Sequence, residues 1–115
     1  MSQVEIIHNP RCSKSRQTLE LLQQQGIEPT IIEYLKQPLD AVRIQSILDA
    51  LAIDAHQLLR IKEAEYKEHN LHPNASAQDI INAMVASPKL IERPIVINGD
   101  KARIGRPPES VLEIL

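Results

Sequence analysis

Cysteine is almost absent from this 115-residue sequence, in which Cys12 is the only one. A lone cysteine cannot form an internal disulfide, and a disulfide-stapled secreted scaffold would need several. The four histidines and Cys12 show no spacing typical of a zinc site. We therefore expect no metal and no resident cofactor, and a free thiol that is either structural or reactive.

Aromatic residues are also scarce, because the chain has no Trp, no Phe and only Tyr34 and Tyr66. A platform that stacks single-stranded nucleic acid needs aromatic faces, so this class of function is excluded. The formal net charge of -2 provides no general attraction to nucleic acid or to an anionic membrane. We expect neither as a partner, and any bound anion must be held by local groups.

Long apolar runs are missing as well. The N-terminal stretch MSQVEIIHNP has no basic leader, and its apolar part is too short for a signal peptide or a membrane span. We therefore expect a cytoplasmic protein. The length suits one globular domain, and no linker or repeat interrupts it, which predicts a single domain over residues 1–115.

The pattern of apolar residues predicts alternating strands and helices. β-branched and apolar runs bounded by Pro, Gly or Asn are typical of strands, and apolar residues spaced by three and four are typical of helices. We predict strands over 4–7, 30–35, 94–97 and 102–104, and helices over 13–25, 40–51, 54–59, 76–86 and after Pro107-Pro108, with 63–69 as a brief helix or loop.

The order of these elements indicates an α/β protein with a thioredoxin-like fold. A right-handed crossover makes the first two strands parallel, and Asn98-Gly99 indicates an antiparallel hairpin for the last two. The result is a mixed sheet with a helical insertion of about residues 40–90 between strands two and three. The helix after Ser76 carries Ile80, Ile81, Met84 and Val85, and the last helix carries Val111, Leu112 and Leu115.

The stretch HNPRCSKSR places Cys12 where the first strand enters the first helix. Backbone N–H groups and the helix dipole lower the pKa of a thiol at that position and can also bind an oxyanion. Arg11, Lys14 and Arg16 add positive potential. The alternative is a small buried hydrophobic residue, which is what most free cysteines are. The polar neighbours favour a nucleophile.

His8 and Ser15 are candidates for supporting the thiolate. Ser15 can donate a hydrogen bond to the sulfur or cap the helix. His8 closes the first strand and either tunes the thiol or fills space as a hydrogen-bonded side chain, and both interpretations stay open.

Three arginines stand in apolar or turn contexts, namely Arg60, Arg93 and Arg106. Arg93 and Arg106 each precede a proline, which keeps the backbone extended and can direct the rigid guanidinium group at an anion. Singly, each is more typical of a surface residue or a structural ion pair. Together they would form an anion site, if the fold brings them to one place.

Five sequence pieces, in order along nearly the whole chain, resemble the glutaredoxin-coupled arsenate reductases, called the ArsC family, and among them a compact subgroup. The pieces are His8-Asn9-Pro10-x-Cys12-x-x-Ser15-Arg16, the strand Thr30-Ile31-Ile32-Glu33-Tyr34-Leu35, Leu58-Leu59-Arg60, Glu92-Arg93-Pro94-Ile95-Val96, and Arg106-Pro107-Pro108-Glu109 with Val111-Leu112. The ordered set is far more specific than a cysteine motif alone.

The resemblance implies that Cys12 attacks arsenate and that Arg60, Arg93 and Arg106 bind the oxyanion. It also implies glutathione as an external reductant and glutaredoxin as a partner. The absence of a second cysteine agrees, because resolution must then come from another thiol. A cis bond is expected at Arg93-Pro94, as in the thioredoxin-like pattern. We expect a monomer.

Two functions from other classes stay open. The first is a redox regulator of the Spx type that binds RNA polymerase, although such regulators carry a C-x-x-C switch whose second position here is Ser15. The second is a module that binds glutathione or an anion without turnover. The pKa of Cys12 separates nucleophilic catalysis from simple binding.

Overall fold

The computed structural model describes residues 4–115, which form two compact units. The first unit combines the residues up to Gln37 with Arg93–Leu115, and the second is the continuous segment Pro38–Glu92. The expectation of one domain with a helical insertion over about residues 40–90 stays a prediction.

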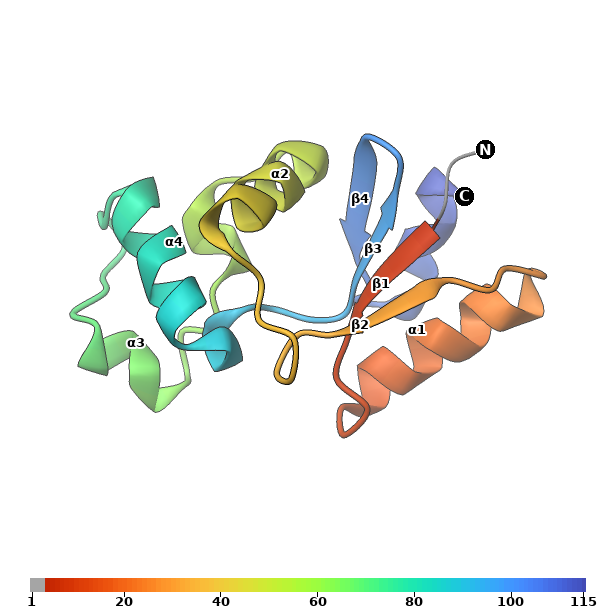
Figure 1. The fold of residues 1–115 in the computed structure, drawn as a ribbon, viewed down its shortest axis with the longest axis horizontal. Coiled ribbons are helices and arrows are strands. Elements are labelled where there is room, and N and C mark those ends of the chain that lie inside the picture. The colour runs from red at the N-terminus through yellow and green to blue at the C-terminus, as the bar shows by residue number, and fades with distance from the viewer. Residues whose placement is uncertain (1–3) are drawn as a thin grey trace. The chain divides into compact units, whose positions relative to one another are not determined.

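A four-stranded mixed sheet forms the centre of the first unit, in the order β2-β1-β3-β4 (Figure 1). β1 pairs in parallel with β2 and antiparallel with β3, and β3 pairs antiparallel with β4. This confirms the predicted parallel first pair, the hairpin and the thioredoxin-like α/β class. The elements are β1 (Val4–His8), α1 (Ser13–Gln24), β2 (Thr30–Glu33), β3 (Ile95–Asn98), β4 (Lys101–Ile104) and the 3-10 helix η3 (Pro108–Ile114).

The second strand is shorter than the predicted 30–35 segment. β2 ends at Glu33, because its carbonyl oxygen accepts hydrogen bonds from the N–H groups of Lys36 and Gln37 at 2.9 and 2.8 Å, which closes a turn. Ile31 on this edge strand is 45% exposed. The early turn brings residues 34–36 close to the end of β1, since β1 and β2 are parallel neighbours.

The core of the first unit lies between the sheet and two helices on one face. Ile6 of β1, Leu22 of α1 and Val96 of β3 are fully buried and pack with Val111 and Ile114 of η3. Aliphatic side chains alone fill this cluster, as the lack of Phe and Trp predicts. Because α1 is packed against the sheet along its length, the start of the helix is held in a fixed position.

The C-terminal segment corrects a sequence-based expectation. The predicted helix carrying Val111, Leu112 and Leu115 is the 3-10 helix η3, in which Leu112 is 41% exposed. Leu115 lies directly after η3 and is 42% exposed. A 3-10 helix has three residues per turn, so residues three apart share a face. The face toward the core is accordingly Pro108, Val111 and Ile114.

The second unit is helical. Its elements are α2 (Ala41–Leu51), the 3-10 helix η1 (Ala55–Leu58), α3 (Ala64–Glu68), α4 (Ala77–Ala86) and the 3-10 helix η2 (Pro88–Leu90). The predicted starts are confirmed, since the side chain of Asp40 caps α2 and that of Ser76 caps α4. Of the apolar residues named for this helix, Ile80, Ile81 and Met84 are buried and Val85 is 38% exposed. In residues 4–115, the helices are all too short or too polar to cross a bilayer.

Gly105 permits a close approach between the end of β4 and α1. A Cβ atom at this position would lie 2.5 Å from Oγ1 of Thr18 and 2.8 Å from Cγ of Pro94. Thr18 is itself fully buried, and its hydroxyl donates to the Lys14 carbonyl at 2.8 Å. The contact therefore requires glycine.

Replacing Gly105 by alanine is expected to destabilise the protein by about 1–3 kcal/mol, because the added methyl group overpacks a buried contact. Urea unfolding measures this loss. Thr18→Ala should relieve part of this loss, since it removes Oγ1 and Cγ2 of Thr18 but leaves the contact with Cγ of Pro94. The matched control is Gly26→Ala. Gly26 has a positive φ, but no atom lies within 4 Å of an added Cβ, so Thr18→Ala should not change the stability lost in Gly26→Ala. If the losses of unfolding free energy caused by Gly105→Ala and Thr18→Ala simply add in the double variant, the packing explanation is contradicted.

Candidate active site around Cys12

Three chain segments of the first unit meet at one edge of the sheet. Cys12 follows the end of β1, Arg93 precedes the start of β3, and Arg106 follows the end of β4. β1 and β4 are both antiparallel to β3, so the ends of β1 and β4 lie beside the beginning of β3. The strand register therefore brings together residues separated by more than eighty positions in the sequence.

A tight turn delivers the thiol to the start of α1. The N–H of Cys12 donates to the carbonyl of Asn9 at 3.0 Å, and the Asn9 side chain accepts from the N–H of Arg11 at 3.0 Å. Cys12 occupies the N-cap position in an extended conformation, and no side-chain hydrogen bond caps the helix. The thiol thus stands where a capping oxygen would normally accept hydrogen bonds from the first turn.

The pKa of the Cys12 thiol lies below its ordinary value. Burial is the largest single influence and raises the pKa of Cys12. Smaller influences together outweigh it and lower the pKa; in order of size they are the backbone N–H of Ser15, the charge of Arg93, the backbone N–H of Lys14 and the charge of Arg106. The site therefore favours the nucleophilic thiolate form of Cys12.

Arg106 makes a direct contact with the sulfur. Its Nη2 lies 3.6 Å from Sγ of Cys12, and its Nε donates to the carbonyl oxygen of Arg93 at 2.9 Å. The second bond orients the guanidinium group. Of the three arginines expected at an oxyanion, the structure thus places Arg93 and Arg106 beside Cys12. The expected cis bond at Arg93-Pro94 is present, and a second cis bond occurs at Arg106-Pro107.

Ser15 supports the thiolate through its backbone rather than its side chain. The sequence suggested a hydroxyl directed at the sulfur or at the helix cap. In the structure, Oγ of Ser15 instead lies 2.7 Å from Nδ1 of His8 and accepts from the N–H of Asn9 at 3.0 Å. Ser15 is fully buried. Its hydroxyl therefore ties the end of β1 to the first turn of α1, which fixes the N–H group that stabilises the thiolate.

His8 is buried at the end of β1, and burial lowers the pKa of its imidazole. The charge of Glu33 raises this pKa to a smaller extent, and that of Arg16 lowers it. The neutral ring is thus the favoured form, and His8 reaches Cys12 only through Ser15. It acts on the position of the helix start rather than as a positive charge at the sulfur.

Arg60 belongs to the second unit, and its role at the oxyanion stays a prediction. Its Nη1 forms an ion pair of 2.7 Å with Glu63, and its Nε lies 4.0 Å from Glu92. The backbone N–H of Arg60 donates to the carbonyl of Leu90 at 2.8 Å. These contacts hold the side chain in one orientation within its own unit.

Glu33, Thr18 and Gly105 are the residues near the site that the sequence did not single out. A carboxylate at the end of a strand and a threonine in a helix are common and carry no signal of their own. The stretch Gly105-Arg106-Pro107 did carry one, because glycine before a turn often marks a close backbone approach. Over residues 4–115, no cluster of three or more histidine, cysteine or acidic side chains is placed to hold a metal ion.

Comparison with known proteins shows the family of this chain. The model of the ArsC family matches residues 7–114. An arsenate reductase of Haemophilus influenzae is 52% identical over 114 residues, which cover 97% of this chain and 98% of that protein. The chain belongs to the ArsC family.

Two further proteins are similar over nearly their whole length. The uncharacterized protein YfgD of Escherichia coli is 53% identical over 115 residues, which cover 98% of this chain and 97% of that protein. The structure of an arsenate reductase from Vibrio cholerae has a TM-score of 0.95 at 46% identity and covers 99% of this chain and 98% of that one. The names of the Haemophilus influenzae and Vibrio cholerae relatives, both arsenate reductases, support an enzymatic role.

The arrangement in this ArsC-family chain is suited to nucleophilic attack on a tetrahedral oxyanion. The thiolate and the N–H groups of the first turn lie at the positive end of the α1 dipole, and the first turn contains no acidic side chain. A guanidinium group stands directly beside the sulfur. An incoming anion would therefore meet positive potential at the point where it reaches the nucleophile.

Arg106→Gln is expected to slow alkylation of Cys12 at neutral pH, because the loss of the adjacent charge raises the pKa of Cys12 and reduces the thiolate fraction. The rate of reaction with iodoacetamide as a function of pH measures this shift. Lys101→Gln is the matched control, since this exposed side chain lies in the β3–β4 hairpin. Equal alkylation rates for Arg106→Gln and the wild type would show that Arg106 does not stabilise the thiolate.

The free energy of unfolding is expected to fall as the pH drops below about 6.5, the usual pKa of histidine. The folded protein keeps His8 neutral in that range, while the unfolded chain takes up the proton, so acid favours unfolding. His8→Gln should reduce this pH dependence. Urea unfolding of both proteins at pH values above and below about 6.5 measures this dependence. An identical change of unfolding free energy with pH in both proteins would show that His8 has an ordinary pKa in the fold.

Proposed function

We propose that the protein is an arsenate reductase in which the Cys12 thiolate is the nucleophile and Arg60, Arg93 and Arg106 bind the oxyanion. The observation that supports it most is the 3.6 Å contact between Nη2 of Arg106 and Sγ of Cys12 at the start of α1. A thiolate repels an arsenate anion unless cations neutralise both. Guanidinium groups do so with directed, charge-assisted hydrogen bonds.

The first chemical step forms a sulfur–arsenic bond. The thiolate of Cys12 attacks arsenic, and one arsenate oxygen departs as hydroxide and is released as water once it is protonated. Arsenic keeps its oxidation state of five in this adduct. The guanidinium group of Arg106 contacts the sulfur, and the charge of Arg93 also favours the thiolate, so both arginines would stabilise the charge of the attacking atom and of the oxyanion.

The reducing electrons must come from outside the chain. Because the chain has no second cysteine, glutathione supplies the next thiol: it attacks arsenic in the adduct and displaces a second hydroxide, which leaves as water. The glutaredoxin thiolate then attacks the glutathione sulfur, and the electron pair of the broken sulfur–arsenic bond reduces arsenic to the trivalent state. Water cleaves the remaining bond to Cys12, which releases arsenite and the thiolate. The overall reaction balances: arsenate and two thiols yield arsenite, one disulfide and one water. Two electrons pass from the two sulfur atoms to arsenic.

The setting that suits this chemistry is the cytoplasm, where glutathione keeps thiols reduced. The protein would act there as a monomer that meets glutaredoxin transiently. No bound cofactor is required, because glutathione enters and leaves as a co-substrate.

Arsenite formation from arsenate, glutathione and glutaredoxin tests the proposal. Cys12→Ser should abolish turnover, and Arg60→Gln, Arg93→Gln and Arg106→Gln should each lower kcat/KM for arsenate by about tenfold or more, since each removes a charged hydrogen bond. Lys101→Gln should match the wild type. Full activity of Cys12→Ser, or no turnover by the wild type, would overturn the proposal.

A further inference from the structure

A pocket lies beside the loop that carries Cys12, within the first unit. Its volume is about 250 Å³, and two segments line it: residues 8–11, which lead to the thiol, and residues 33–36, which turn away from β2. The two segments are neighbours because β1 and β2 are parallel and His8 is the register partner of Glu33. The three arginines proposed to bind the oxyanion and Cys12 itself do not line this pocket, so the space within it has no assigned role.

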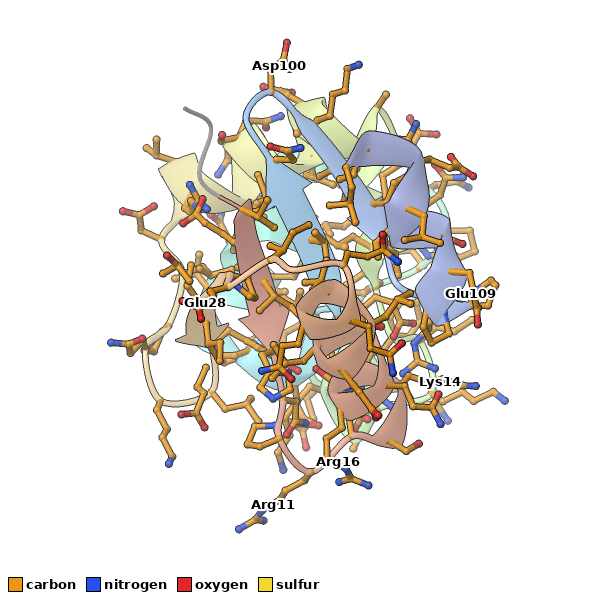
Figure 2. The ribbon with its side chains drawn as sticks, turned by 90° about the vertical axis from the view of Figure 1, so that its right-hand side faces the viewer. Arg11, Lys14, Arg16, Glu28, Asp100 and Glu109 are labelled. Atoms are coloured by element: carbon orange, nitrogen blue, oxygen red, sulfur yellow. The ribbon has the colours of Figure 1, made fainter. Side chains whose placement is uncertain are left out.

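The charges of this pocket form a distinct pattern. Arg11 and Lys36 provide two cationic groups, Glu33 provides one carboxylate, and Leu35 adds an apolar side chain that is 43% exposed. Nζ of Lys36 lies 3.8 Å from Oε1 of Glu33. The side chains of Glu33 and Lys36 are 37% and 78% exposed, so each can also bind a ligand from the solvent side. Figure 2 shows Arg11 projecting outward from the loop at the start of α1.

We propose that this pocket, the loop pocket, binds the tripeptide thiol glutathione. The inference rests on the proposed function, in which glutathione is the reductant. Glutathione carries two carboxylates, one ammonium group and a central thiol. Two cationic side chains and one carboxylate complement these charges, with Arg11 and Lys36 binding carboxylates and Glu33 binding the ammonium group. At about 250 Å³ the pocket is near the lower limit of small-molecule sites, about 300 Å³, which suits part of a tripeptide.

The position of the loop pocket fits a co-substrate of Cys12. Its wall of Asn9, Pro10 and Arg11 runs directly into Cys12, and the turn is closed by the hydrogen bond from the N–H of Cys12 to Asn9. A tripeptide with its ends on Arg11 and Lys36 would therefore hold its central thiol beside the nucleophile. Binding raises the effective concentration of that thiol at the sulfur–arsenic adduct.

Another cavity of the first unit has the wrong charge for this ligand. It lies between α1 and η3 and is lined by Glu20, Glu109 and two glutamines among others, with no cationic side chain. An anionic tripeptide would be repelled there. Glu20 also lies in the second half of α1, whereas Cys12 stands at its start.

Direct binding separates this proposal from the catalytic one. S-methylglutathione cannot react, so its affinity for the Cys12→Ser protein can be measured by calorimetry without arsenate or turnover. We expect Arg11→Gln and Lys36→Gln each to weaken binding by about two- to fivefold, the usual effect of an exposed ion pair, and Lys101→Gln to leave it unchanged. Unchanged affinity in both pocket variants, or no binding at all, would overturn the loop pocket whether or not arsenate is reduced.

The kinetic counterpart uses thiols of different charge in the arsenate assay. Lys36→Gln should raise KM for glutathione and leave turnover with 2-mercaptoethanol, which carries no carboxylate, unchanged. Glutathione ethyl ester lacks one carboxylate. Its KM with the wild type should therefore exceed that of glutathione, as when one cationic side chain of the pocket is removed. An equal loss with both thiols would indicate a structural defect and contradict the proposal, while S-methylglutathione binding without arsenate turnover would leave the pocket standing and overturn the proposed function.

Discussion

The charge on one sulfur atom is the constraint on which the rest of this structure depends. Cys12 is partly buried, and burial alone would keep its thiol protonated. The fold counters this with two N–H groups of the first turn of α1 and two guanidinium groups. The helix start gives up a side-chain cap, which normally stabilises a helix by about 1 kcal/mol, and its first turn carries no acidic residue. Stability at this end of α1 is thus lower in favour of a reactive thiolate.

The elements around the sulfur serve mainly to hold these groups in place. The antiparallel pairing of β3 with β1 and with β4 brings Arg93 and Arg106 to the end of β1. Gly105 lets the chain pass closely over Thr18 of α1, so the guanidinium of Arg106 is anchored next to the helix that carries its target. The Ser15 hydroxyl ties His8 to the same helix start. In the proposed reaction, these positioned N–H and guanidinium groups are what the site offers to the oxyanion.

Sequence reasoning succeeded where the signal is local. The parallel first pair, the hairpin at Asn98-Gly99 and the helix starts at Asp40 and Ser76 follow from short patterns of apolar, capping and turn residues. It failed where tertiary packing decides. A period of three rather than 3.6 decides which residues of Pro108–Ile114 face the core, and that period cannot be read from so few residues. Likewise, the partner of the Ser15 hydroxyl depends on how closely β1 and α1 approach, which no local pattern records.

The most direct test of the central claim is the pKa of Cys12 in the unmodified protein, measured by the ultraviolet absorbance of the thiolate during a pH titration. Only one cysteine contributes, so the signal needs no deconvolution. The account predicts a midpoint below the value of about 8.5 for a free cysteine. A midpoint at or above that value would mean that burial prevails over the helix start and the arginines, and the case for a nucleophile would fail.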